Sequence, residues 1–282
     1  MHDPKRILLT VFVALLLAAA VSGQRIGVIS PDNQSQSIDI AERISTALST
    51  RVKVVDLELA RTAFDSVETP SAFNMTAEES KIAGAAIGCD YLLILRSETL
   101  NRFSLEKRGY FESYAAFWLI SARTGRLVGF ELVTFNGFNR ADPLRLLEES
   151  APATAATLFK HIAADAKSDP VPIATRAMEV PSSDSPEAAR FRIPMSYRRV
   201  SPKYTQSANF YSIAATVDIE VELDVKGTIV RTEIVRWAGF GLDESVEEAV
   251  RAMNWRAAER DSKPVPVKFV LRYNFKKVEK DE

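Results

Sequence analysis

Hydrophobic and polar residues alternate over the stretch ATVDIEVELDVKG, which begins at Ala215. Successive side chains of an extended strand point to opposite faces, so the alternation predicts a strand with one apolar and one acidic face. No histidine lies nearby to support a metal site, and a calcium ladder has no other support, so we expect the carboxylates to face water. The acidic face carries Asp218, Glu220, Glu222 and Asp224, and the apolar face carries Val217, Ile219, Val221, Leu223 and Val225.

A small folded unit is predicted around this strand. A turn at Lys226 and Gly227 leads to a returning strand through Val235. The segment from Asp243 to Trp255 has an apolar stripe at helical spacing, with acidic residues near its start and arginines near its end, as the helix dipole favours. The final strand alternates again and carries Val265, Val267, Phe269, Leu271, Tyr273 and Phe275 on one face. One helix over a sheet of these strands gives a small α+β unit.

An earlier region, from Arg25 to about Ala166, mixes strand-like and helix-like patterns. RIGVIS, VKVVDL and DYLLIL are typical of short buried strands, whereas SIDIAERISTALS and the segment from Thr76 to about Gly88 have helical spacing. A hairpin is predicted in YAAFWLISARTGRLVGFELVTF, and a single long helix from Pro143 to about Lys167 follows it. The order β-α-β-α-β-β-β-α indicates a layered α/β domain, so we expect α+β architecture for the whole chain.

The N-terminal segment has the order of a secretory signal peptide. The basic pair KR precedes an apolar run from Ile7 to Val21, and small residues follow. A spanning helix needs ~20 apolar residues, and this run of about 15 is shorter, so we expect residues 1–23 to be cleaved. The alternative is an uncleaved anchor that holds the protein at the inner membrane, facing the periplasm.

Composition then predicts the remaining boundaries. Residues 24–167 form the α/β envelope domain, and residues 168–194 contain several prolines among small and acidic residues, which suits a linker. Residues 195–282 form the C-terminal domain.

The net charge and the cysteine content argue against nucleic-acid binding and against a disulfide-stabilised fold. The formal net charge of −1 gives no overall field that attracts nucleic acid, so we expect no nucleic-acid partner. Cys89 is the only cysteine, so no internal disulfide can form, and its apolar surroundings favour a buried structural role.

No catalytic or cofactor site can be assembled from the sequence. His161 is the only histidine that remains after signal-peptide removal, and no nucleophile lies near it in sequence. One histidine and one cysteine do not make a usual zinc site. The GFG motif at Gly239–Gly241 lacks the third glycine of a dinucleotide-binding loop, and acidic residues follow it. We therefore expect no enzymatic activity, no metal and no cofactor.

Several motifs of the C-terminal region occur together: SPKY with Ala208, ELDVKG, AGFGLDESVEEAV, NWRAAERDSKP and the closing YNF. In order and spacing, this region resembles the TonB C-terminal domain family, whose members include energy transducers, from about Arg199 to Lys277. It departs from the family where Thr205 and Ala257 replace prolines and where Ser262 replaces a glycine. More weakly, residues 25–166 resemble the periplasmic α/β domains of the TolB N-terminal and CsgG type, on RIGVIS, AAIGCDYLLIL and FWLISARTGRLVGF.

The resemblance to the TonB family implies partner binding by strand addition at the edge of the sheet. The implied partner-binding residues are Val267, Phe269, Leu271, Tyr273 and Phe275 of the closing strand, with Ser201, Lys203 and Tyr204 nearby. Lys268, Arg272 and Lys276 can also protect this edge against aggregation.

We therefore expect a non-enzymatic periplasmic protein that binds an outer-membrane receptor or another envelope protein. Energy-coupled transport with an inner-membrane motor complex is implied only if the N-terminus is uncleaved, and a homodimer stays open. The alternative is an exported scaffold or regulator of envelope assembly in which the N-terminal domain is the functional part.

The first testable prediction concerns the N-terminus. Sequencing or intact-mass measurement of the protein from cells should show a mature chain that begins at Gln24, because the apolar run is too short for a stable anchor. Recovery of a chain that still begins with Met1 contradicts cleavage and favours the anchored alternative.

Overall fold

The computed structural model describes residues 23–103, 109–168 and 177–276. The predicted signal peptide therefore lies outside the described residues. The chain forms two compact units. Of the described residues, the first unit comprises 23–73, 79–103 and 109–168, and the second comprises 74–78 and 177–276.

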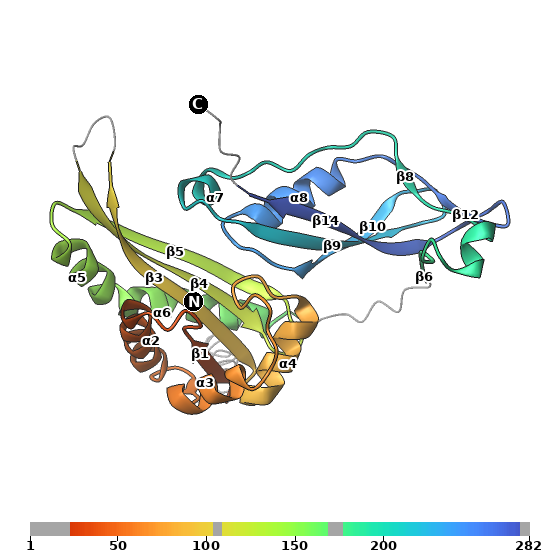
Figure 1. Ribbon diagram of the computed structural model, residues 1–282. Coiled ribbons are helices and arrows are strands. Elements are labelled where there is room, and N and C mark those ends of the chain that lie inside the picture. Colours follow the sequence, from red (N-terminus) through yellow and green to blue (C-terminus); the bar gives the residue numbers. More distant parts are fainter. Residues whose placement is uncertain (1–22, 104–108, 169–176, 277–282) are drawn as a thin grey trace, which may run out of the picture. The chain divides into compact units, whose positions relative to one another are not determined.

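The first unit contains a mixed five-stranded sheet in the order β2-β1-β3-β4-β5 (Figure 1). β1 (Arg25–Ile29) pairs in parallel with both β2 (Lys53–Val54) and β3 (Tyr91–Arg102). β4 (Tyr110–Ser121) pairs antiparallel with β3 and with β5 (Leu127–Gly137). The sheet thus combines a short parallel part with a long antiparallel meander.

In the described part of this unit, five helices accompany the sheet. They are α2 (Ser35–Leu48), α3 (Leu57–Asp65), α4 (Ala77–Ile87), α5 (Ala141–Glu149) and α6 (Ala151–Asp165). A continuous core joins α2, α5 and α6 to the sheet, through buried residues such as Ile44, Leu158 and Phe117. The layered arrangement follows from apolar stripes on the helices that face the apolar side of the strands.

The structure differs from several sequence predictions for this unit. The long helix expected from Pro143 is two helices, α5 and α6, which meet at Ser150. The strand expected in VKVVDL is only two residues long. Helix α3 was not predicted, although Asp56 accepts hydrogen bonds from the backbone N–H groups of Glu58 and Leu59 and so caps its start.

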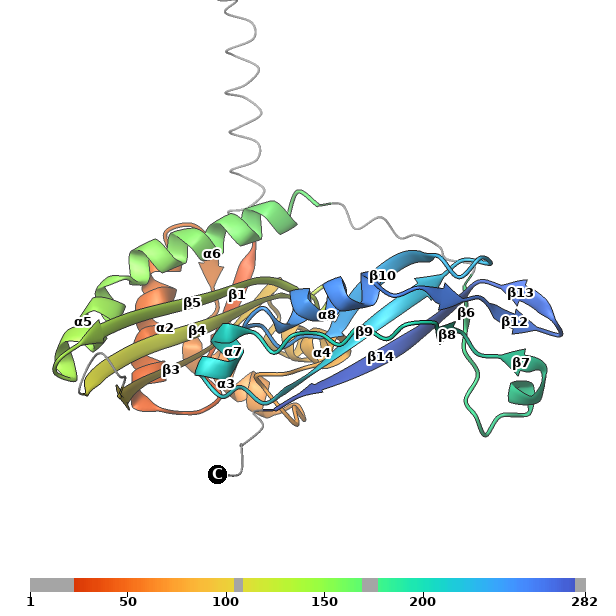
Figure 2. The same ribbon diagram turned by 90° about the horizontal axis from the view of Figure 1, so that it is seen from above.

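The second unit is built on a four-stranded sheet in the order β10-β9-β14-β6. β9 (Ala215–Leu223) pairs antiparallel with β10 (Ile229–Arg236) and with β14 (Val267–Phe275). β6 (Met178–Glu179) adds to β14 in parallel. Helix α8 (Leu242–Arg251) packs on this sheet (Figure 2). The α+β class expected from the sequence is confirmed.

The core of this unit follows the alternation of its strands. Val217, Ile219 and Val221 are fully buried, as are Val246 and Val250 of α8. The helix ends at Arg251, earlier than expected, because Trp255 belongs to a short strand, β11 (Trp255–Arg256).

Shorter elements complete the second unit. They are η1 (Pro186–Arg190), β7 (Phe191–Arg192), β8 (Met195–Ser196), α7 (Gln206–Phe210), β12 (Ala258–Arg260) and β13 (Lys263–Val265). β7 pairs with β12, and β8 pairs with β11. Two of these elements, η1 and β7, lie with β6 in the range 168–194, where the sequence favours a linker. From Met178 onward, strands of this range pair with strands of the C-terminal domain.

The acidic face of β9 differs from the expectation of free, hydrated carboxylates. Asp218 accepts hydrogen bonds from Arg272 at 2.7 and 2.9 Å and from Arg236 at 3.2 Å. Burial opposes ionisation of Asp218, but these two guanidinium groups outweigh it and hold its pKa below the usual range. Asp224 instead stabilises the turn, where it accepts the N–H groups of Lys226 and Thr228.

The GFG motif forms a tight turn before α8. Gly239 and Gly241 have φ of 75° and 74°, in the left-handed region that favours glycine. The carboxylate of Asp243 accepts the N–H groups of Ala238 at 2.9 Å and Gly239 at 2.7 Å. The turn thus serves to start the helix, and its N–H groups already bind the carboxyl group of a side chain of the same chain.

A pH dependence of stability follows from Asp243. Burial raises its pKa to about 7, although the hydrogen bonds from Gly239 and Ala238 act in the opposite direction. In the unfolded chain the pKa is about 3.9, so between about pH 4 and pH 7 only the folded state holds this proton. This contribution to stability is therefore complete below about pH 4, decreases by at most about 1.4 kcal/mol per pH unit as pH rises, and levels off above about pH 7.

Asp243→Asn should remove this decrease, because the amide stays neutral throughout. The measurement is the urea midpoint of the C-terminal unit, followed by the NMR amide signals of α8 at pH 4.5 and pH 7.5. Equal pH dependence in the native and D243N chains contradicts the assignment.

Candidate partner-binding edge

The outer edge of β14 is the candidate binding site. Along its inner edge, β14 pairs with β9 over the whole length from Val267 to Phe275. On the outer side, β6 pairs only with Val267 and Lys268. In the described part of the chain, no strand pairs with the outer side beyond Lys268.

The hydrogen bonds of β6 identify which backbone groups point outward. The N–H of Met178 donates to the carbonyl of Pro266 at 3.0 Å, and the N–H of Val180 donates to that of Lys268 at 3.2 Å. Backbone groups of alternate residues point to the same side of a strand. The N–H and C=O groups of Val270, Arg272 and Asn274 therefore point outward from the open part of the edge.

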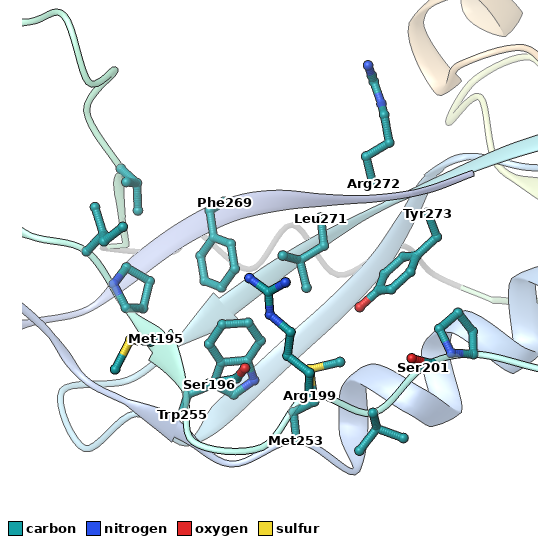
Figure 3. Close-up of a pocket in the computed structure, with 15 residues that line it drawn as sticks. Met195, Ser196, Arg199, Ser201, Met253, Trp255, Phe269, Leu271, Arg272 and Tyr273 are labelled. Carbon is teal, nitrogen blue, oxygen red and sulfur yellow. The ribbon is translucent and has the colours of Figure 1, made fainter. Parts of the chain in front are cut away.

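A cavity of about 780 Å³ adjoins this edge. Figure 3 shows Phe269, Leu271 and Tyr273 pointing from β14 into the cavity, whereas Arg272 points away from it. Segment 193–202 and the stretch from Met253 to Trp255 provide other walls. The side chains that alternate along β14 thus form one wall of a largely apolar cavity.

The electrostatic character of the cavity is set by arginine. None of the lining residues is acidic, and the guanidinium group of Arg199 lies among the aromatic and aliphatic side chains (Figure 3). Burial raises the pKa of Tyr273, and the nearby charge of Arg199 acts in the opposite direction. The cavity therefore suits apolar groups together with a negative charge.

The residues implied for the closing strand divide into two groups. Phe269, Leu271 and Tyr273 are half-buried and line the cavity. Val267 and Phe275 are 0% and 9% exposed, so their side chains belong to the core. The structure therefore brings together only part of this set at a surface that a partner can reach.

The preceding segment is held in place by hydrogen bonds. Ser201 lines the cavity. The backbone of Lys203 donates to Ser245 Oγ and accepts from the same hydroxyl, at 2.8 and 2.9 Å. The hydroxyl of Tyr204 donates to the carbonyls of Ala208 and Ile213, at 3.1 and 2.8 Å.

Tyr204 also stacks on Phe275, with ring centroids 6.3 Å apart. Lys203 and Tyr204 therefore position the loop beside the edge.

Other cavity residues were not predicted from the sequence. Val180, Met195 and Trp255 come from separate short strands or from the residues that follow them. The signal in the sequence was limited to apolar residues such as Met195 within a proline-containing segment. Its meaning depends on tertiary packing, which periodicity does not report.

The described residues show little that supports catalysis. They contain no group of three or more histidine, cysteine, aspartate or glutamate side chains that could hold a metal ion. Burial raises the pKa of the Cys89 thiol to about 11, so this group stays protonated near neutral pH. His161 contacts Glu131 at 2.8 Å, and both side chains are partly buried in the first unit.

Comparison with protein families identifies the C-terminal region. Residues 200–276 match the family "Gram-negative bacterial TonB protein C-terminal". The resemblance found in the sequence motifs is confirmed, because residues 200–276 match the TonB C-terminal domain family. The match supports the interpretation that this chain is an envelope protein and that its C-terminal region resembles a non-catalytic family. A search of the curated proteins found no significant match.

Several solved structures are similar to parts of the chain. The TonB C-terminal domain of Pseudomonas aeruginosa is 20% identical, covers 32% of this chain and 90% of its own, and has a TM-score of 0.26. The PelC dodecamer from Paraburkholderia phytofirmans is 15% identical, covers 50% and 89%, and has a TM-score of 0.29. TolB from Acinetobacter baumannii is 14% identical, covers 50% and 28%, and has a TM-score of 0.31.

The weaker resemblance of residues 25–166 to the TolB and CsgG domains stays a prediction.

Among the described residues, no helix has the length and apolar character that a membrane span requires.

Tyr204→Phe tests the positioning of the segment beside the edge. Removing the hydroxyl leaves the carbonyls of Ala208 and Ile213 without this donor, so the C-terminal unit should lose about 1–2 kcal/mol of stability. The measurement is urea unfolding of the full chain, followed by NMR signals of this unit. Tyr197→Phe is the matched control, because Tyr197 is 70% exposed. Equal stability of Y204F and Y197F contradicts the positioning role.

Proposed function

We propose that this chain is a non-enzymatic, periplasmic envelope protein whose C-terminal domain binds an extended segment of an outer-membrane receptor or another envelope protein. The segment adds as a strand to the outer edge of β14. The observation that carries the proposal is the row of outward-facing backbone groups at Val270, Arg272 and Asn274. Unpaired edge groups bind an added strand through main-chain hydrogen bonds, and adjacent pockets select its side chains.

The cavity supports the same proposal. An added strand places every second side chain on the face where Phe269, Leu271 and Tyr273 point. Apolar side chains at these positions gain contact with the cavity wall, and an acidic side chain gains the charge of Arg199. These features favour a partner segment that carries both apolar and acidic residues.

Two further roles depend on other parts of the chain. Energy-coupled transport requires an N-terminal anchor that contacts a motor complex, so it fails if the mature chain begins at Gln24. A scaffold or regulator role assigns the function to the first unit, and the binding experiment below separates this role from edge docking.

Val270→Pro tests edge docking. Proline removes the outward N–H of Val270 but no inward hydrogen bond to β9, because the inward groups belong to the neighbouring residues. Val270→Thr keeps the N–H and is the matched control. Both substitutions fall on a side chain that is 53% exposed, which limits their effect on the core.

The measurement is crosslinking in cells, with a photoreactive amino acid in place of Arg272, whose side chain is 62% exposed. We expect a crosslink to an outer-membrane or periplasmic protein that V270P reduces about tenfold relative to V270T, since one edge hydrogen bond and the close approach of the strand are lost. Equal crosslinking in the two variants, with both folded by NMR, contradicts strand addition and favours the scaffold role.

A further inference from the structure

β6 of the same chain occupies the first part of the outer edge of β14, at residues 266–268. Met178 and Val180 donate their N–H groups to the carbonyls of Pro266 and Lys268. Glu179 forms an ion pair with Lys268 at 3.2 Å. β6 therefore already makes, over a short length, the kind of pairing that a partner strand is proposed to make.

Val180 also enters the candidate cavity. The register aligns Val267 with Met178 and Lys268 with Glu179, so an extension of β6 by one residue would place Val180 opposite Phe269. Val180 lines the same cavity as Phe269. The occupied and open parts of the edge therefore form one continuous line that leads past the same cavity.

The pairing of β6 with β14 contributes little stability. Its paired region is two residues long, and the Glu179 side chain is 81% exposed, so its ion pair contributes little. The chain that follows is tied down more firmly: Arg190 donates two hydrogen bonds to Asp261, at 2.7 and 2.8 Å, and β7 pairs with β12. β6 can therefore leave β14 while the later part of the segment stays attached.

We propose that Met178–Val180 is an intramolecular competitor for the partner-binding edge of β14. This inference rests on the proposed function and adds regulation to the same site. A partner strand that pairs only along Val270–Asn274 leaves β6 in place. A strand that extends to Pro266 must displace β6, so its affinity is lowered by the fraction of molecules in which β6 is paired.

The competition can be measured without the natural partner. The probe is the acetylated and amidated peptide AMEVPS, which has the sequence of residues 177–182. A segment held by its own chain acts at a local concentration of about millimolar, so it excludes a weakly binding copy added in solution. Binding to the full mature chain is followed by the NMR amide signals of residues 268 and 270.

Val180→Pro releases the competitor. It removes the N–H that bonds to Lys268, and proline is compatible with an extended backbone at the preceding residue. We expect V180P to bind the peptide at least about tenfold more tightly than the native chain. Val180→Thr keeps the N–H and should bind like the native chain.

A reversible lock gives the opposite test. Glu179→Cys and Lys268→Cys, in a Cys89→Ser background, place two thiols at paired positions of β6 and β14. The oxidised chain should bind no peptide, and a reductant should return binding to the level of the native chain.

Equal affinity of the native chain, V180P and the oxidised lock overturns the competition. Absence of peptide binding to every variant also overturns it, because the segment then does not pair with the edge as a free strand. The crosslinking experiment at Arg272 is independent: loss of the envelope partner with V180P still binding the peptide contradicts the proposed function alone.

Discussion

The open outer edge of β14 is the constraint on which the account depends. Backbone N–H and C=O groups need hydrogen-bond partners, and β14 satisfies its inner groups along its full length through β9. β6 satisfies only the first outward groups. From Val270 to Asn274, the outward N–H and C=O groups are available to another chain. These groups give the C-terminal domain a defined place at which a partner strand can pair.

The two faces of β14 have different tasks. On the cavity face, Phe269, Leu271 and Tyr273 continue the apolar row of the core to a surface that a partner can reach. On the opposite face, Asp218 joins Arg272 of β14 to Arg236 of β10. This charged cluster links the strands on both sides of β9, so the sheet presents its edge as a fixed template.

The sequence predicts the regular parts of this domain well, since Val217 to Leu223 and Val267 to Phe275 alternate with period two and have a single apolar face. It does not predict β6, because a strand of two residues has no measurable periodicity and pairs only through tertiary contacts. The cavity was missed for the same reason, as its walls come from separate segments. Asp218 was assigned to water because alternation identifies a face but not the arginines that neutralise it.

Amide hydrogen exchange of the full chain, with and without the envelope partner that the crosslinking identifies, tests the central claim most directly. The account predicts that the amides of Val270, Arg272 and Asn274 exchange rapidly in the free protein and become protected in the complex, whereas Leu271 and Tyr273 are protected in both. Unchanged exchange at these three residues, with new protection elsewhere in the chain, contradicts docking at the edge of β14.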